Sequence, residues 1–258
     1  SRKAGHTITV TAMTTAMMNT VMMRGIPTIT TTMTDVSATR AAMRLQSWLS
    51  PAFPVGAYSY SHGVEAAIEA GLVTDAETLR DWIEGLLRFG SGASDAILLS
   101  EAWRHASAGD AEALGTLTEF ATALIPTAEL RLEATSQGTA FVKTVSAAWG
   151  EIEQVALPPA PPLPVAYGAV TAAAGIALDL VGPLYVQAFV HNIVSAAVRA
   201  VPLGQTDGQR VIAALEACVD EVWRTSEGCG TDDIGTAALM AEWSSMQHEA
   251  MDGRLFRS

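Results

Sequence analysis

Apolar side chains recur every three or four positions along most of this chain, which is the spacing of one face of an α-helix. Residues 74–89 give the clearest case, because Thr74 and Glu77 have the spacing of a capping box at a helix N-terminus. Behind them a single apolar stripe contains Leu79, Trp82, Ile83, Leu86, Leu87 and Phe89. No segment alternates apolar and polar residues over the length of a strand, and no unit repeats at a fixed period. The pattern therefore predicts an all-α fold.

Prolines, glycines and N-capping residues divide this pattern into separate helices. Two prolines and a glycine within residues 50–56 end the first helix, and Gly71 ends the second. Five prolines within residues 157–164 predict a stiff linker, and the cluster at residues 231–233 is expected to cap the last helix. The expected single-domain bundle of about ten helices covers residues 40–49, 61–71, 74–89, 94–105, 110–125, 127–149, two helices within 163–201, 205–225 and 231–250.

Residues 163–201 are almost continuously apolar and fit either a transmembrane hairpin or two helices buried in a protein core. Asp179 lies near the middle, and Gln187, His191 and Asn192 follow it; such polar residues are costly in lipid. The apolar content is mostly Ala and Gly, and each half is only about 16–18 residues long, which is short for a span. We therefore expect a buried hairpin and keep a small helical membrane protein as an alternative.

The composition fits a folded cytoplasmic protein. The 258 residues suffice for one large helical domain or two small ones, and 49% of them are apolar, so a sizeable core is expected. The formal net charge of −12 argues against nucleic acid and against anionic membranes, and it fits a basic protein partner. Cys218 and Cys229 would lie about 16 Å apart on one helix, too far for a disulfide, so two reduced thiols are expected.

Residues 1–39 differ from the rest of the chain, because they hold twelve Thr and six Met with little periodicity. Thr and Asn interrupt the apolar run that a signal peptide needs. We expect a disordered, non-native tail, with Met33 as a candidate initiator and the helical domain at residues 40–258. A Met-rich Cu(I) site is the alternative, since thioether sulfur suits that ion.

Signatures of common catalytic sites are missing from the sequence. It contains no phosphate-binding GxxxxGK[ST] loop, no GxGxxG and no HExxH, and Ser59 does not lie in a GxSxG turn. The five histidines are scattered, so a metal site would need residues that converge from distant segments. The protein is therefore expected not to be an enzyme, with a hydrolase built from distant residues as the alternative.

Two segments carry polar and aromatic residues that a core alone does not require. Residues 54–65 (PVGAYSYSHGVE) fit either a turn in which Ser61 caps the next helix or an exposed binding surface. Residues 254–258 (RLFRS) place two arginines around Leu255 and Phe256. This ending fits either tail packing or an anchor in a partner's groove.

A third polar feature lies on the second half of the apolar hairpin. Its members share one helix face at four-residue spacing and are Gln187, His191, Ser195 and Arg199. A polar ridge on an apolar helix is either an internal hydrogen-bond network or an interface stripe.

These segments resemble the signatures of a known family. Residues 49–65 (LSPAFPVGAYSYSHGVE) resemble the N-terminal signature of the urease accessory protein UreF. Residues 129–141, 192–206 and 245–258 resemble the remaining signatures in the same order, so the resemblance covers about residues 43–258. Met251-Asp252-Gly253 departs from an expected Leu-Tyr-Ser, and the loss of that aromatic residue is expected to weaken docking of the tail.

The resemblance implies an all-helical homodimer that binds UreD (also called UreH), then the nickel-carrying GTPase UreG, on the path to apo-urease. It implies a maturation factor that bridges these partners, with no permanently bound cofactor and with nickel only in transit. By this resemblance, Arg254, Leu255, Phe256, Arg257 and Ser258 form the UreD contact, with Leu255 and Phe256 in an apolar pocket. Candidates for the dimer and GTPase surfaces are Pro54, Gly56, Tyr58, Ser59, His62, Glu65, Arg199, Pro202, Gly204 and Gln205.

Two histidines are weaker candidates for contact with the nickel ion. Neutral imidazole is a good nickel ligand, and His62 and His248 both lie within segments that resemble the family. No residue is expected to hold the metal permanently.

Overall fold

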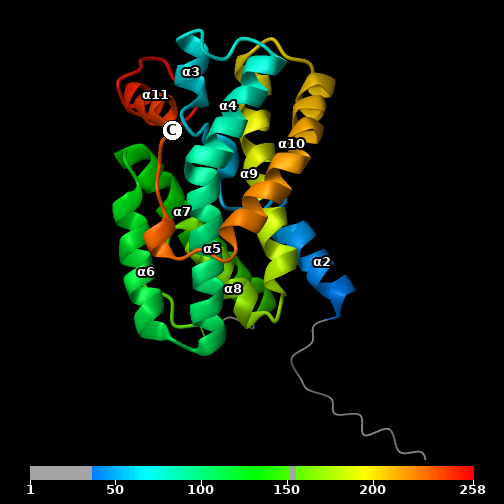
Figure 1. The fold of residues 1–258 in the computed structure, drawn as a ribbon, viewed down its shortest axis with the longest axis vertical. Coiled ribbons are helices and arrows are strands. Elements are labelled where there is room, and N and C mark those ends of the chain that lie inside the picture. Colours follow the sequence, from blue (N-terminus) through cyan, green and yellow to red (C-terminus); the bar gives the residue numbers. More distant parts are fainter. Residues whose placement is uncertain (1–36, 151–154) are drawn as a thin grey trace, which may run out of the picture. The chain divides into compact units, whose positions relative to one another are not determined.

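The computed structural model describes residues 37–150 and 155–258, and within these ranges it contains α-helices and short 3-10 turns but no β-strand. The prediction of an all-α fold is confirmed. The interpretation of residues 1–39 lies almost wholly outside the described residues and stays a prediction. The helices are α2 (Ala38–Trp48), α3 (Val64–Glu69), α4 (Ala76–Phe89), α5 (Ser91–Ala108), α6 (Ala111–Leu124), α7 (Ala128–Trp149), α8 (Leu163–Ala173), α9 (Leu178–Ala200), α10 (Gln205–Ser226) and α11 (Leu239–Glu249), with 3-10 turns η1 (Ala57–Ser59) and η2 (Thr231–Asp233) (Figure 1).

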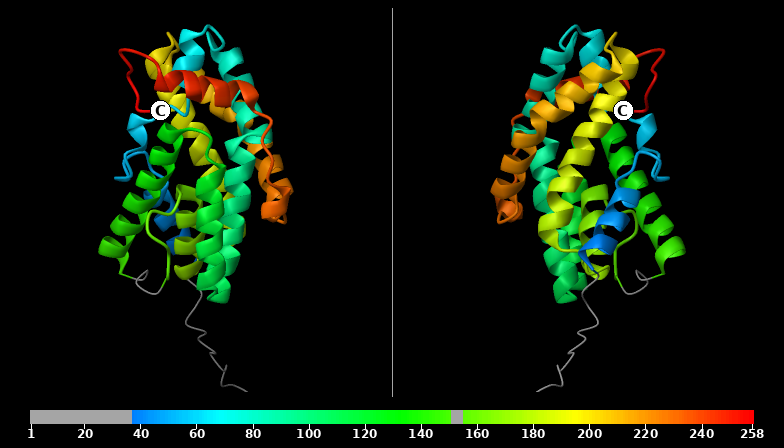
Figure 2. Two further views of the ribbon diagram at one scale, coloured as in Figure 1. Left: turned by 90° about the vertical axis from the view of Figure 1, so that its left-hand side faces the viewer. Right: turned by 90° about the vertical axis from the view of Figure 1, so that its right-hand side faces the viewer.

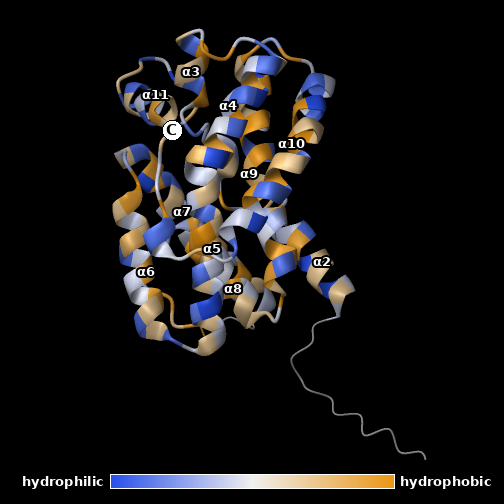
Figure 3. Ribbon diagram, viewed as in Figure 1, coloured by the Kyte–Doolittle hydropathy of each residue, from blue (hydrophilic) through white to orange (hydrophobic). Residues whose placement is uncertain are grey.

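The helices that form the body of the bundle pack around α5 and α8. Gly168 allows this close approach, because a Cβ atom at that position would lie 2.3 Å from the carbonyl oxygen of Leu99 on α5. Phe141 of α7 stacks on Tyr167 of α8 with 3.9 Å between ring centroids, and Trp48 of α2 meets Phe141 edge to face. Helices such as α4 and α10 alternate hydrophilic and hydrophobic residues along the ribbon, as expected for helices with one buried face (Figure 3).

The apolar segment at residues 163–201 forms α8 and α9. Helix α8 has only 11 residues, and most of its side chains are buried in the core. Among the described helices α9 alone is long and apolar enough to cross a membrane, and half of its most apolar window is buried inside the protein. The buried hairpin agrees with this packing better than the membrane alternative.

Two predicted helix starts are wrong. The capping box of α4 consists of Asp75 and Thr78, one residue after the predicted pair of Thr74 and Glu77. The Asp75 carboxylate accepts the Thr78 N–H at 2.9 Å, and the Thr78 hydroxyl accepts the Asp75 N–H at 3.0 Å. Helix α3 begins at Val64, after Gly63, rather than at the predicted residue 61. The Ser61 hydroxyl still accepts the N–H of Glu65 in the first turn at 3.4 Å, as the capping interpretation predicts.

The last helix also begins later than predicted, at Leu239. The cluster at residues 231–233 forms only the turn η2, in which Asp233 accepts the N–H of Gly230 at 3.0 Å. The following residues run across to the end of α4, where the carbonyl of Phe89 accepts the N–H of Ala237 at 2.8 Å. This contact with a distant helix replaces the helical hydrogen bonds that the local sequence favours.

Helices α3 and α11 lie together at one end of the bundle, and the C-terminal end of the chain lies beside them (Figure 1). The two side views show α11 lying across this end of the long helices (Figure 2). Both cysteines are free, and Cys229 lies beyond the end of α10 rather than on it.

Candidate functional site

The C-terminal tail, residues 254–258, folds back into its own chain. Its backbone joins the segment before α3, since the Arg257 N–H donates to the Ser59 carbonyl at 2.8 Å. The Ser61 N–H donates to the Ser258 carbonyl at 3.0 Å, and the Ser61 hydroxyl donates to the same oxygen. The two segments that carry the resemblance, residues 49–65 and the chain end, are therefore in direct contact.

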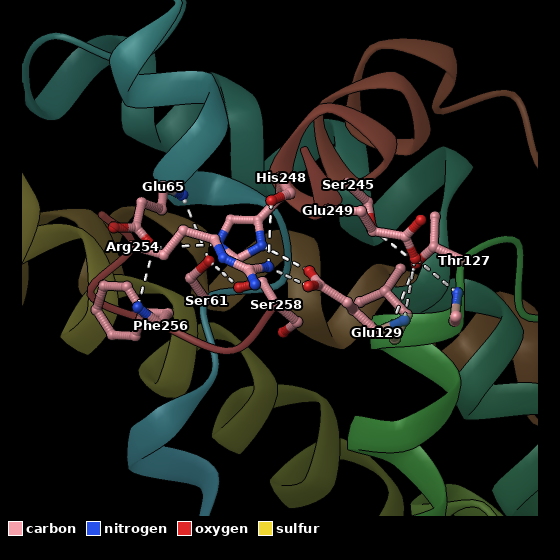
Figure 4. Close-up of polar contacts among 12 residues, drawn as sticks. Ser61, Glu65, Thr127, Glu129, Ser245, His248, Glu249, Arg254, Phe256 and Ser258 are labelled. Carbon is pink, nitrogen blue, oxygen red and sulfur yellow. Dashed lines mark hydrogen bonds and ion pairs between the residues drawn. The ribbon is translucent and has the colours of Figure 1, made fainter. Parts of the chain in front are cut away.

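A single carboxylate on α3 holds the tail in place. Glu65 is buried, and its Oε1 accepts the Leu255 N–H at 2.7 Å while its Oε2 accepts the Phe256 N–H at 3.0 Å (Figure 4). Gly63 at the start of α3 has φ +75°, and a Cβ atom there would lie 3.1 Å from the Ser245 nitrogen on α11. The glycine therefore lets α11 approach closely enough for the two helices to share this site.

His248 of α11 is fully buried between two carboxylates. Its Nε2 lies 3.0 Å from Oε2 of Glu65, and its Nδ1 lies 2.7 Å from Oε2 of Glu129 (Figure 4). His248 therefore links α3, α7 and α11 through both of its ring nitrogens.

The start of α7 receives acidic groups from α11 and an arginine from the tail. Oε1 of Glu249 accepts the N–H groups of Ala128 and Glu129 at 2.8 and 3.2 Å, which satisfies helix N–H groups that lack a partner within α7. Arg254 forms an ion pair with Glu129 and donates to the carbonyl of His248 at 3.3 Å. Arg254 therefore ties the tail to α7 and α11 together.

Arg199 near the end of α9 connects the tail to the turn η1. Its guanidinium lies 3.8 Å from the ring centroid of Tyr58 and 4.5 Å from that of Phe256. It also donates to the Tyr58 carbonyl at 2.9 Å. Three segments that are distant in the sequence thus meet at one arginine.

A second acidic position on α7 binds the end of the tail. Glu133 is buried and accepts the Ser258 hydroxyl, and its Oε1 lies 3.0 Å from Nδ1 of His62. Gln137 donates to the same Oε1 at 3.1 Å. His62 itself adopts φ 56°, a left-handed conformation that is uncommon for residues other than glycine.

His62 and Glu133 also line a cavity of about 290 Å³, together with Asp95, Tyr185 and Phe189. Burial raises the pKa of Asp95 to about 6, although the nearby His62 and the Tyr185 hydroxyl act in the opposite direction. Burial by itself would lower the pKa of His62, but the charge and hydrogen bond of Glu133, with the charge of Asp95, outweigh it and raise that pKa. The cavity therefore has an acidic, titratable wall.

The structure divides the predicted tail residues into two groups. Phe256 and Ser258 point inward and are buried, whereas Leu255 is 71% exposed and Arg257 is exposed. Phe256 thus packs in the apolar core of its own chain, and Leu255 is the apolar side chain that the tail leaves exposed.

The remaining predicted residues differ in what they contact. Tyr58 is 70% exposed, and Ser59 receives a tail hydrogen bond through its carbonyl. Five of the predicted residues are exposed and have no described contact with the tail, namely Pro54, Gly56, Pro202, Gly204 and Gln205. On the polar ridge of α9, His191 and Ser195 face solvent, whereas Arg199 takes part in the internal contacts of the tail.

Sequence reasoning named Glu65 but missed the other acidic partners of the tail. Glu133 lay within residues 129–141 but was not singled out, because its role depends on His62 and Ser258, which are distant in the sequence. Glu129 lay within a family signature but had no predicted partner. His248 was considered only as a metal ligand, and both of its nitrogens are occupied by carboxylates. Within the described ranges no cluster of three or more His, Cys, Asp or Glu side chains is arranged to hold a metal ion.

The fold and this site define an all-α protein whose polar centre fixes its own C-terminal tail against α3, α7 and α11. The profile of the UreF family matches residues 73–216. A urease accessory protein UreF of Rhodopseudomonas palustris (strain BisA53) is 45% identical over 237 residues, which cover 87% of this chain and 98% of the relative. UreF proteins of Bradyrhizobium diazoefficiens and Azorhizobium caulinodans are 45% and 44% identical and cover 87% and 88% of this chain, with 95% and 100% of the relatives covered. The chain belongs to the UreF family of urease accessory proteins, and this assigns it a role in urease maturation.

Proposed function

We propose that this protein is a non-enzymatic scaffold that bridges UreD (also called UreH) and the GTPase UreG while nickel is delivered to apo-urease. It acts in the cytoplasm as a homodimer. The single observation that carries the proposal is the tail surface, which we define as Tyr58, Arg199, Leu255 and Arg257. These residues come from three separate segments, and the hydrogen bonds of the tail bring them together.

The composition of the tail surface supports a protein contact. Exposed Leu255 and Tyr58 supply apolar and aromatic area, and Arg199 and Arg257 supply charge in a chain whose net charge is −12. Tyrosine and arginine are enriched among residues that dominate binding energies at interfaces. In this arrangement Phe256 anchors the tail within its own chain and Leu255 enters an apolar pocket of UreD.

The test is co-purification of the full chain with co-expressed UreD and UreG. We expect Leu255→Glu to weaken the UreD complex about ten- to hundredfold, because a buried leucine contributes roughly 1.5–3 kcal/mol. Leu184→Glu is the matched control, since Leu184 is also an exposed leucine but lies on α9 near its N-terminal end. Equal UreD recovery with both variants would remove the tail surface from the proposal.

Nickel transit is the second part of the proposal, and it rests on His62. His62 lines the cavity beside Glu133 and Asp95, whereas His248 has no free nitrogen in this arrangement. Calorimetric titration with nickel is expected to give weaker binding for His62→Ala and unchanged binding for His105→Ala, whose histidine lies near the end of α5. Equal nickel affinity of His62→Ala and the parent would exclude His62 from the path.

A further inference from the structure

The charges around the cavity beside His62 are unbalanced. The described residues that line this cavity include three carboxylic acids, Asp95, Glu133 and Glu242, but no lysine or arginine. His62 is the only histidine among these lining residues, and its Nδ1 lies 3.0 Å from Oε1 of Glu133. Even a protonated His62 therefore leaves negative charge in excess, and the cavity suits a cation rather than an anion.

Asp95 on α5 is the acidic group in this cavity whose hydrogen bonds are incomplete. Its Oδ2 accepts the Tyr185 hydroxyl at 3.2 Å. Its other oxygen, Oδ1, has no partner among the described residues and is not sealed off by neighbouring atoms, so it faces the cavity that Asp95 lines. Both oxygens of Glu133, by contrast, are occupied by His62 and by Ser258. Since a buried carboxylate normally has all of its acceptors paired, Asp95 offers an open acceptor to a donor inside the cavity.

The walls of the cavity indicate what kind of molecule carries that donor. Aromatic rings of Tyr167, Tyr185 and Phe189 line the same cavity, and such rings attract organic cations as well as apolar groups. A metal ion needs several oxygen, nitrogen or sulfur ligands, and in the described part of the chain no three His, Cys, Asp or Glu side chains are arranged to supply them. An alkylammonium ion brings N–H donors, a positive charge and an apolar body of its own. Its chemistry therefore matches both the open carboxylate and the apolar walls.

We propose that this cavity binds a small organic ammonium ion, whose N–H groups donate to Oδ1 of Asp95 and whose apolar part packs against Phe189 and Tyr185. Ser91 lies one turn before Asp95 on α5 and also lines the cavity. Its hydroxyl has no partner among the described residues, so it supplies a second acceptor for the ammonium group. The site uses no residue of the tail surface and requires no nickel at His62, so it stands or falls independently of the scaffold function.

NMR titration of the full chain with n-butylammonium chloride at constant ionic strength tests the proposal. We expect a dissociation constant of about 1 mM or tighter, which is within reach of a ligand with about five non-hydrogen atoms. The neutral probe 1-butanol has nearly the same size and should bind at least about tenfold more weakly, because it cannot pair with the carboxylate. The anionic probe butyrate should not bind. Nuclear Overhauser effects from the butyl methylene protons to the Phe189 ring should place the ligand in the cavity.

One conservative substitution isolates the role of the carboxylate. Asp95→Asn keeps the size of the side chain and removes its charge, so it should weaken n-butylammonium binding at least about tenfold. Its affinity for 1-butanol should equal that of the parent, which shows that the cavity persists in the variant. Asp179→Asn is the matched control, because Asp179 is exposed at the start of α9 and does not line the cavity.

Several outcomes would overturn the proposal. Equal affinities for n-butylammonium and 1-butanol would describe a cavity that selects only for apolar bodies. Equal n-butylammonium affinities of Asp95→Asn and the parent, or contacts to residues outside the cavity, would assign the binding to the acidic surface of the chain. Absence of binding would show that the cavity holds only water. Each of these results would leave co-purification with UreD and UreG unchanged, so the scaffold function is tested separately.

Discussion

Replacement of Glu65 by glutamine should release the C-terminal tail while leaving the helices folded. The Glu65 carboxylate accepts the N–H groups of Leu255 and Phe256 and lies 3.0 Å from Nε2 of His248. In glutamine, an NH₂ group replaces one of the two carboxylate oxygens. This NH₂ group must therefore face at least one of the groups that now donate to Glu65. The variant therefore removes at least one hydrogen bond to a charged acceptor and leaves a buried donor without a partner.

The size of the effect follows from the burial of the site. A hydrogen bond to a charged group contributes about 1.5–3 kcal/mol, and an unpaired buried donor costs about 1–3 kcal/mol. These contributions overlap, so we expect the docked tail to lose about 2–4 kcal/mol relative to the released tail. This corresponds to an increase of about 30- to 1,000-fold in the equilibrium constant for opening. The helices keep their own core, so the opening stays local.

Hydrogen exchange measured by NMR or by mass spectrometry of the C-terminal peptide reports this opening. Protection of the Leu255 and Phe256 amides should fall by the same factor, and trypsin should cleave after Arg254 faster than in the parent. Glu69→Gln is the matched control, because Glu69 lies one turn further along α3 and is exposed. Unchanged protection in Glu65→Gln would refute the conclusion that this carboxylate holds the tail.

Three further predictions concern the tail, the contact between α3 and α11, and the cavity. Phe256→Ala should cost the docked tail about 3–5 kcal/mol, whereas Leu255→Ala should leave tail exchange nearly unchanged because that side chain is 71% exposed. Gly63→Ala should lower the free energy of unfolding in urea by about 1–3 kcal/mol, more than Gly71→Ala, which has a similar positive φ but open space around it; equal losses would contradict the close contact. The pKa of Asp95 is raised to about 6, so the folded state binds its proton more tightly than the unfolded state does. The free energy of unfolding should therefore fall by up to about 3 kcal/mol as pH rises from about 4 to about 6. Asp95→Asn should flatten the urea-derived stability profile in that pH range, and an unchanged slope would show that this carboxyl is not responsible.

Periodicity and helix-breaking residues allowed the all-α class and most helix boundaries to be predicted. Helix α10 was expected at residues 205–225 and lies at Gln205–Ser226, because its apolar stripe is regular and its ends carry glycines. The predicted start of the last helix was wrong because residues 231–233 form the separate turn η2. Further along, Ala237 donates its N–H to the carbonyl of Phe89 on α4 instead of joining a helix. A local sequence window contains no information about that distant carbonyl.

The site was predictable only in part. Family signatures drew attention to residues 54–65 and to the tail, but the sequence left open whether each segment packs internally or binds a partner. The structure shows that these five residues divide between the two, since Phe256 is buried in its own chain and Leu255 stays exposed. Glu133 and the two carboxylates around His248 depend on three-dimensional convergence of α3, α7 and α11, and periodicity cannot reveal such contacts.

The polarity of α11 and the docking of the tail have one physical cause. Because α11 must bring His248 between Glu65 and Glu129, its inner face is polar and its apolar residues are left outside. The same carboxylates hold Arg254 and the amides of the tail, so loss of the network would displace the tail surface and α11 together. A partner that binds only the docked form must therefore stabilise it, by about 2.7 kcal/mol when its concentration is a hundred times its dissociation constant. That gain lies within the range expected for the loss in Glu65→Gln, so a saturating partner should restore protection of the tail amides to near the level of the free parent chain.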